Sequence, residues 1–247
     1  MANGFDPRIG GGTNPAATVD RKGVAVDAGL RAHMLSVYNY MTSGVLLTGI
    51  VALLFATSGA VFSLFGETGP SLLGYVVMFA PLGIVLWMSF GVNRLSTGTA
   101  QFLYWAFAIL MGMSLSTIFL VYTGGSIALT FFATAAAFAS LSLWGYTTKK
   151  DLSGFGTFLI MGLVGIIVAS IANLFWMNDT FSLAIAAIGV LIFAGLTAYD
   201  TQKIKSMYFA VAGTDFQGKA AIMGALTLYL DFINMFLFLL RFLGSRD

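Results

Sequence analysis

Long apolar stretches separated by short polar connections run through most of this chain. Five segments contain no Asp, Glu, Lys or Arg: residues 34–66, 68–93, 95–148, 152–178 and 180–199. A helix needs about 20 such residues to cross the hydrocarbon core of a bilayer. Strands of a membrane barrel would alternate apolar and polar positions over about ten residues, whereas residues 160–171 are apolar on every side. The pattern therefore predicts membrane-spanning helices.

The pattern predicts seven such helices, and hence an all-α polytopic membrane protein built as a seven-helix bundle. Segment 95–148 must contain two of them, and its natural break is residues 123–126, because the glycine pair there permits the chain to reverse. We expect residues 1–30 to form a cytoplasmic tail, disordered until about Asp27, and residues 31–247 to form a single transmembrane domain. The expected spans are residues 34–56, 72–92, 102–122, 127–146, 155–176, 181–199 and 221–240.

Composition agrees with this interpretation and excludes several other classes of protein. The chain is 58% hydrophobic and 9% charged, whereas an ordinary soluble domain is roughly 25% charged. A net charge of +2 is too small to indicate a nucleic-acid partner. The chain has no cysteine and one histidine, which excludes disulfides and thiolate metal sites and argues against a metallohydrolase.

The distribution of Lys and Arg predicts the orientation in the membrane. With a cytoplasmic N-terminus, ten of the twelve basic residues fall on the cytoplasmic side, as the positive-inside rule requires. The two exceptions, Arg241 and Arg246, follow the last span. Either the C-terminus lies outside, or the last segment is re-entrant and returns to the cytoplasm. The ten are Arg8, Arg21, Lys22, Arg31, Arg94, Lys149, Lys150, Lys203, Lys205 and Lys219.

Two acidic residues stand out within the apolar segments. Asp200 is expected to end the sixth span, and Asp231 lies near the middle of the seventh. A carboxylate at that depth costs about 2.5 to 3.5 kcal/mol, so it needs a partner. Asp231 shares one helical face with Thr227 and Asn234, which are candidates to line an ion path, and we expect this polar face to point into the bundle. A purely structural role for Asp231, bonding to a neighbouring helix, remains an alternative.

The two acids are expected to lie on neighbouring helices, because only a short connection separates the last two spans. Two close carboxylates cannot both ionise cheaply, so the pair would titrate as one coupled unit. When ionised, Asp200 and Asp231 would offer hard oxygen ligands to a cation such as calcium. Arg94 follows the second span and is a candidate partner of Asp200 in a closed state, with a simple anchoring role as the alternative.

The strings that contain these acids resemble the C-terminal signature of the Bax inhibitor-1 family. They are YDTQKI at residues 199–204 and LYLDFIN at residues 228–234. The resemblance extends over residues 31–244, and between the two acids residues 209–218 look like an inserted loop. Further matches are GMSLS at 112–116, KKDLS at 149–153 and FLLRFLG at 238–244.

The resemblance implies a bundle whose last helix is central, and a pH-sensitive calcium leak in which Asp200 and Asp231 form a di-aspartyl pair. It also implies an arginine that latches to the first aspartate, which by position is Arg94. No cofactor is implied beyond calcium as the transported ion. The animal members' association with cell death is not carried over. We expect a bacterial cytoplasmic membrane, where some relatives are similar to modulators of a membrane-bound AAA protease.

Three functions compete at this point. The leading hypothesis is a passive, pH-gated leak for calcium or other cations, gated by the two acids. The second makes the chain an interaction protein that regulates a membrane protease through its N-terminal tail, with the aspartates only holding the fold. An intramembrane aspartyl protease is disfavoured, because Asp231 lacks the flanking glycines that would let a substrate backbone come close. We therefore expect no enzymatic activity.

Overall fold

The computed structural model describes the backbone of residues 15–176 and 178–245 and the side chains of residues 28–175 and 178–245. The described residues form seven long α-helices, each long and apolar enough to cross a membrane, and none of them lies in a strand of a sheet. Two short 3₁₀ helices, η1 (Ala60–Leu64) and η2 (Ser116–Leu120), follow α1 and α3. The seven helices are α1 (Pro15–Thr57), α2 (Leu72–Gly91), α3 (Thr97–Leu115), α4 (Gly124–Thr147), α5 (Ser153–Trp176), α6 (Asp179–Val211) and α7 (Gln217–Leu243).

Short polar side chains cap the N-termini of α2, α3, α4 and α6. The hydroxyl of Ser71 accepts a hydrogen bond from the backbone N–H of the third residue along, and Ser96, Thr123 and the amide oxygen of Asn178 do the same at the next N-termini. Such caps satisfy one of the backbone donors that an α-helix leaves free at its start. The break expected at residues 123–126 therefore falls at the first turn of α4, and Thr123 is its cap.

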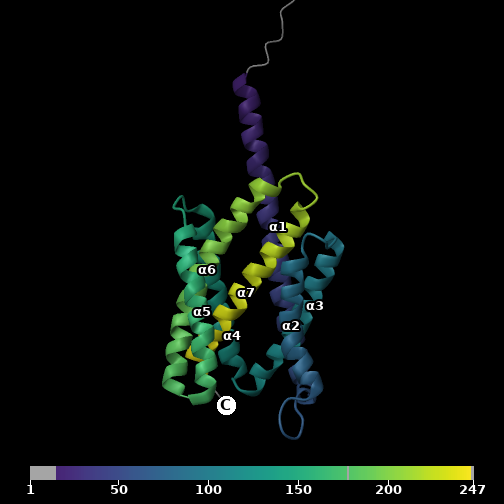
Figure 1. The fold of residues 1–247 in the computed structure, drawn as a ribbon, viewed down its shortest axis with the longest axis vertical. Helices are drawn as coiled ribbons and strands as arrows, with labels where there is room; N and C mark the ends of the chain where they lie inside the picture. Colours follow the sequence, from purple (N-terminus) through teal and green to yellow (C-terminus); the bar gives the residue numbers. More distant parts are fainter. Residues whose placement is uncertain (1–14, 177, 246–247) are drawn as a thin grey trace, which may run out of the picture.

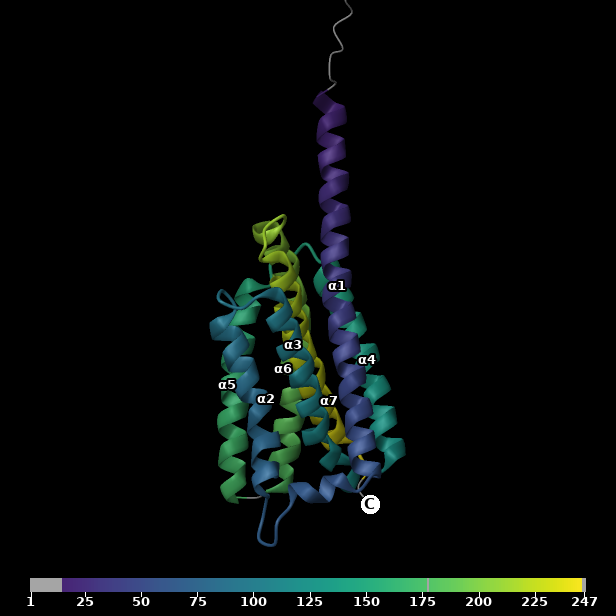
Figure 2. The ribbon, with the colours of Figure 1, turned by 90° about the vertical axis from the view of Figure 1, so that its right-hand side faces the viewer.

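The last helix lies at the centre of the bundle, as the family resemblance implies. α7 packs against α1, α3, α4 and α6, whereas α2 packs mainly on α3 and α5 on α6. Figures 1 and 2 show α7 crossing the molecule between the other helices. In the most apolar part of α7, 61% of the residues are buried, against 11% in α5. The bundle therefore has one helix that is largely shielded from lipid and outer helices that face it.

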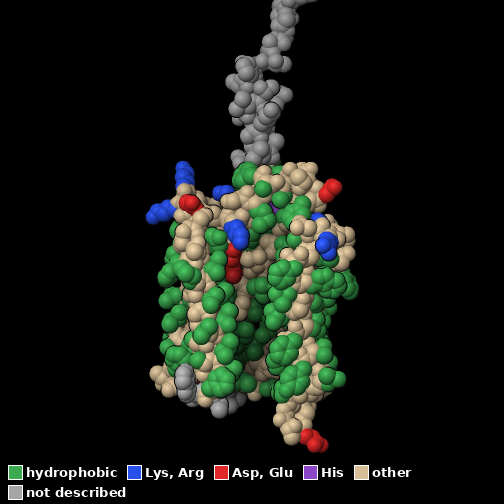
Figure 3. All heavy atoms as spheres, viewed as in Figure 1, with side chains coloured by type: hydrophobic (Ala, Val, Ile, Leu, Met, Phe, Trp, Pro, Cys, Tyr) green, Lys and Arg blue, Asp and Glu red, His purple; other side chains and the backbone are tan. Residues whose placement is uncertain are grey.

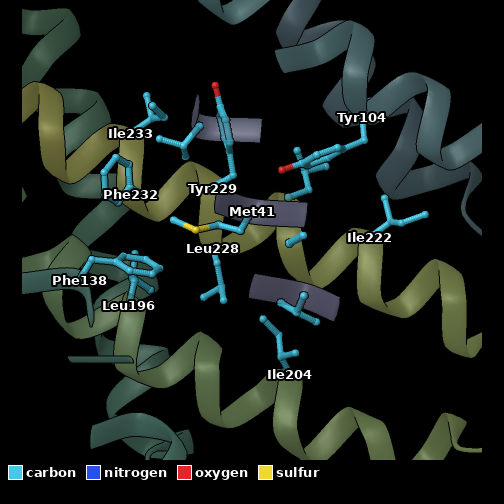
Figure 4. Packing of buried hydrophobic residues seen from close by; sticks show 14 of the residues in the cluster. Met41, Tyr104, Phe138, Leu196, Ile204, Ile222, Leu228, Tyr229, Phe232 and Ile233 are labelled. Carbon is cyan, nitrogen blue, oxygen red and sulfur yellow. The ribbon is translucent and has the colours of Figure 1, made fainter. Parts of the chain in front are cut away.

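The core around α7 combines aromatic packing with buried hydroxyl groups. The ring of Tyr229 is fully buried and lies edge-on to Phe107 of α3, with ring centroids 5.0 Å apart. Its hydroxyl is 2.7 Å from the hydroxyl of Thr48 on α1, which in turn donates to the carbonyl of Ala108 at 2.8 Å. Figure 4 shows Tyr229 and Tyr104 among the aliphatic side chains of this core. These bonds join α1, α3 and α7 in the buried core, where a polar group without a hydrogen-bond partner would be costly.

Several details differ from the sequence predictions. The tail was expected to be disordered until about Asp27, but α1 already begins at Pro15, and residues 1–14 lie outside the described part of the chain. The sixth helix does not end at Asp200 but continues to Val211, because the residues after Asp200 pack on neighbouring elements. The loop expected at residues 209–218 is reduced to residues 212–216, since both of its ends are helical.

The seventh helix crosses the whole bundle. It contains 27 residues, which at 1.5 Å per residue is about 40 Å and is enough to span a bilayer. In Figure 1 the end of α7 lies at the end of the bundle opposite the start of α1. The re-entrant alternative for this segment is therefore wrong. Arg241 lies in the last turn of α7, where a cation is favoured by the helix dipole.

Candidate functional site

Asp200 on α6 and Asp231 on α7 bring two carboxyl groups together inside the bundle. The two side chains lie within hydrogen-bonding reach of each other. Their exposed fractions are only 9% for Asp200 and 4% for Asp231. In Figure 3 acidic side chains are visible deep in a hollow of the molecular surface. We call these two residues the acid pair.

The hairpin formed by α6 and α7 explains why these two residues meet. The helices are joined by residues 212–216 and run in opposite directions. Asp200 lies 11 residues before the end of α6 at Val211, and Asp231 lies 14 residues after the start of α7 at Gln217. At 1.5 Å per residue these distances are about 17 Å and about 21 Å. Two antiparallel neighbours thus place the acids at similar depths, although 30 residues separate them in sequence.

The geometry of the acid pair favours a shared proton. Oδ2 of Asp231 is buried and has no hydrogen-bond donor among the described groups. An ionised carboxylate can only accept hydrogen bonds, so a bond between two carboxyl groups exists only when one of them carries a proton. Two ionised carboxylates at this separation, away from water, would also repel each other strongly. We therefore expect the acid pair to hold one proton between its members.

The cation that acts on Asp200 is Lys203, which lies one helical turn further along α6. It is exposed and close enough to Asp200 to interact with it electrostatically. Arg94, the candidate suggested by the family resemblance, is exposed in the connection between α2 and α3, and among the described side chains no ion pair joins it to Asp200. The i, i+3 spacing within the string YDTQKI was the available signal for Lys203.

The polar face of α7 is only partly buried. Asp231 is enclosed, but Thr227 and Asn234 are half-buried and bond to carbonyl groups one turn back in their own helix, those of Met223 and Leu230. The neighbouring apolar positions Leu228, Phe232, Met235 and Phe236 are buried more deeply. Asp231 is thus enclosed as expected, whereas Thr227 and Asn234 keep part of their surface accessible. A central helix has neighbours on several sides, so its apolar faces are buried as well.

The residues that follow Asp200 hold α6 against α4 and α7. The hydroxyl of Thr201 is 2.8 Å from that of Ser142 on α4, and Ser142 is in turn 2.6 Å from the hydroxyl of Tyr38 on α1. Ile204 packs against Gly224 of α7, where an added Cβ would lie 3.2 Å from Cγ2 of the isoleucine. The position of Asp200 is thus set by contacts that the next turn of α6 makes with α4 and α7.

A hydrogen-bonded clamp holds the connection between α4 and α5 against α6. The side-chain amide of Gln202 donates to the carbonyl of Lys150 at 2.8 Å and accepts from the backbone N–H of Leu152 at 2.9 Å. The ammonium group of Lys205 donates to the carbonyl of Tyr146 at 2.8 Å. The string YDTQKI therefore contacts the matched string KKDLS directly. Because Gln202 follows Asp200 by two residues, the acid pair lies close below a polar end of the bundle.

Asp151 lies in this same connection and has a local structural role. Its carboxylate accepts a hydrogen bond from the backbone N–H of Ser153 at 2.9 Å, at the start of α5. Hydrogen bonds from the side chain and the backbone of Ser153 lower the pKa of the Asp151 carboxyl. Asp151 is fully exposed and caps a helix, in contrast to the buried acid pair.

The acid pair offers few ligands to a cation. Two carboxylates supply at most four oxygen ligands, whereas calcium takes six to eight. In the described part of the chain, no cluster of three or more His, Cys, Asp or Glu side chains is present. A cation at Asp200 and Asp231 would keep much of its water shell. This suits transient occupation better than tight storage.

The fold and this site define a polytopic α-helical membrane protein whose central helix carries half of a buried acid pair. The chain belongs to the Bax inhibitor-1 family: the family described as inhibitor of apoptosis-promoting Bax1 matches residues 30–247. This confirms the resemblance that the sequence strings indicate.

Bacterial relatives match over nearly the whole chain. An uncharacterised protein of Rickettsia prowazekii is 50% identical over 93% of this chain and 96% of its own length. The inner membrane protein YbhL of Escherichia coli is 47% identical over 89% of this chain and 94% of its own. An uncharacterised protein of Borreliella burgdorferi is 39% identical over 86% of this chain and 91% of its own. The family match at residues 30–247 includes both members of the acid pair.

Proposed function

We propose that this protein is a pH-sensitive leak for calcium or other cations, gated by Asp200 and Asp231, and that it acts as a conduit rather than as an enzyme. The observation that carries the proposal is the buried contact between the two carboxyl groups at the interface of α6 and α7. No described cation is buried with them, and Lys203 is exposed. The charge of the pair therefore depends on proton binding.

Loss of the shared proton would push the two helices apart. Two carboxylates about 4 Å apart repel each other by about 4 kcal/mol at an effective dielectric constant of 20. This energy is enough to shift the balance between two packings of a helix interface. A cation that enters between the carboxylates would offset the repulsion, so proton binding and cation binding compete for one site. Such competition makes the cation flux depend on pH.

We propose that the end of the bundle nearest the acid pair faces the cytoplasm of a bacterial inner membrane. The beginning of α1 lies at this end, as do the connections that carry Arg94, Lys149 and Lys150 and the first turn of α7, which carries Lys219. An excess of Lys and Arg favours the cytoplasmic side. The name of the Escherichia coli relative, an inner membrane protein, supports the same location. Cytoplasmic protons would then have a short route to Asp200.

Calcium flux into liposomes tests the proposed leak. We expect purified protein in liposomes that contain a calcium-sensitive dye to admit calcium faster than empty liposomes do, because the acid pair offers a cation a site within the bundle. The rate should change between pH 5 and pH 8 as the pair exchanges protons. The same liposomes without protein, measured at each pH, are the control. A rate equal to that of empty liposomes at every pH would contradict the leak.

A second candidate function is regulation of a membrane-bound protease. It is favoured by the length of α1, whose first turns stand clear of the other helices in Figure 2. A projecting segment can reach a partner beyond the membrane surface. We expect deletion of residues 2–26 to abolish an effect on the proteolysis of a membrane substrate while leaving calcium flux unchanged. Proteolysis that is insensitive to the deletion would remove this candidate and leave the leak untouched.

A further inference from the structure

A groove between α1 and α4 opens on the side of the bundle. It has a volume of about 760 Å³, within the range of typical ligand pockets. Both helices pack against α6 and α7, and Phe232 of α7 lies at the base of the groove. The 2.6 Å hydrogen bond between the hydroxyls of Tyr38 and Ser142 crosses from α1 to α4 within it. Because both walls belong to membrane spans, the groove is open to lipid.

The length of the groove matches one leaflet of a bilayer. On α1 its lining runs from Arg31 to Leu46, which is about 22 Å of helix. Half of a bilayer, including the headgroup region, is about 20 to 22 Å thick. The groove therefore reaches from the headgroup level to about the bilayer midplane. A single acyl chain that lies along it would end near Leu46.

The charges in the groove lie at one end only. Arg31 lines it and is exposed. Lys205 lies beside the same end, with its ammonium group 2.8 Å from the carbonyl oxygen of Tyr146, a lining residue, and 4.9 Å from the centre of the tyrosine ring. No Asp or Glu is among the described residues that line the groove. The remaining lining is largely aliphatic and aromatic, so the occupant should have an anionic head and an apolar body.

We propose that this groove binds one acyl chain of an anionic phospholipid, with the lipid phosphate at Arg31. The chain would lie between α1 and α4 and contact Phe232, the residue that follows Asp231 on the central helix. The base of the groove is also joined to Thr201, the residue after Asp200, through the hydroxyls of Tyr38 and Ser142. The lipid would therefore contact the residue next to Asp231 directly and be linked to the residue next to Asp200 through two hydrogen bonds. Its binding does not depend on whether the protein conducts ions.

Native mass spectrometry of the detergent-purified protein tests this site. After incubation with equal amounts of phosphatidylglycerol and phosphatidylcholine, we expect about one lipid per chain, enriched about fivefold in phosphatidylglycerol, since one basic residue at a membrane surface favours an anionic lipid by about this factor. Arg31→Gln should bring the enrichment to about one while lipid is still retained. Ala135→Phe should reduce retention of both lipids, because its ring would occupy the groove.

Arg94→Gln is the matched control, since it removes an exposed cation that does not line the groove; it should leave the enrichment unchanged. Equal retention of the two lipids by the unaltered protein would overturn the proposal, as would an enrichment that survives Arg31→Gln. A stable dimer that retains no lipid would show that a second copy occupies the groove, which would also overturn it. If Ala135→Phe fails to fold, the comparison of Arg31→Gln with Arg94→Gln still decides the outcome.

Discussion

Replacing Asp231 by asparagine is expected to abolish the pH response of calcium flux and to lower the flux itself by about tenfold or more. Asparagine has nearly the same shape as aspartate but does not titrate, so the acid pair loses the group that shares its proton with Asp200. A bond to a charged group contributes about 1.5 to 3 kcal/mol, and 1.4 kcal/mol corresponds to a factor of ten. The measurement is the initial rate of calcium entry into dye-filled liposomes between pH 5 and pH 8.

Asp179→Asn is the matched control for this experiment. Asp179 is an exposed acid at the start of α6, the same helix that carries Asp200. Its substitution should leave both the flux and its pH response unchanged. Asp200→Asn should reproduce the effect of Asp231→Asn, because either change removes the repulsion between two carboxylates on which the proposed gating depends. A pH response that persists in both variants, with both eluting as folded protein, would assign the two acids a structural role only.

Replacing Gly145 by alanine is expected to destabilise the bundle by about 2 to 3 kcal/mol. Gly145 lies where α4 crosses α6, and an added Cβ would come into severe overlap with the backbone carbonyl of Ala198. A flexible side chain could relieve the overlap by changing its rotamer, but backbone atoms cannot. The two helices must therefore separate. Ser142 precedes Gly145 by one turn on the same face, and its 2.8 Å hydrogen bond to Thr201 would weaken as well. Unfolding in detergent, followed by circular dichroism, measures the loss.

Gly165→Ala provides the matched control on α5. A Cβ added at Gly165 would meet no atom within 4 Å, and alanine favours a helix over glycine by about 0.8 to 1 kcal/mol. This variant should be as stable as the unaltered protein or slightly more so. If Gly145→Ala were equally well tolerated, the close contact between α4 and α6 would not be needed for the fold. The position of Asp200 would then have to depend on other contacts.

The positions of the seven spans could be predicted from the sequence alone. The transfer of a side chain from water to hydrocarbon depends mainly on the residue itself, so a run of about 20 apolar residues is sufficient to indicate a spanning helix. The expected span at residues 72–92 and the observed α2 differ by one residue. The end of the sixth helix could not be predicted in this way. Its last turns are polar and are held by the clamp at Gln202 and Lys205, which is a tertiary contact.

The sequence indicated the two members of the acid pair but not their contact. Asp200 and Asp231 stand out because a carboxylate within an apolar segment is costly. Their contact, however, depends on the depth and rotation of two helices, and 30 residues lie between the two acids in the sequence. The roles of Lys203 and Gln202 were missed, because neither residue is unusual at a polar helix end. Arg94 was singled out by position, but the structure places it without an ion pair to Asp200.

The sequence by itself determined that this chain has seven spanning helices, the family to which it belongs, and which two acids are costly to bury. These properties can be predicted from single residues and short strings, because the cost of moving a side chain from water into hydrocarbon depends mainly on that side chain. Only the tertiary structure decided that Asp200 and Asp231 share one contact, that Thr227 and Asn234 stay half-exposed, and that α1 and α4 leave a groove ending at Arg31. Those features arise from how helices rotate and approach one another, which depends on packing between residues far apart in the chain.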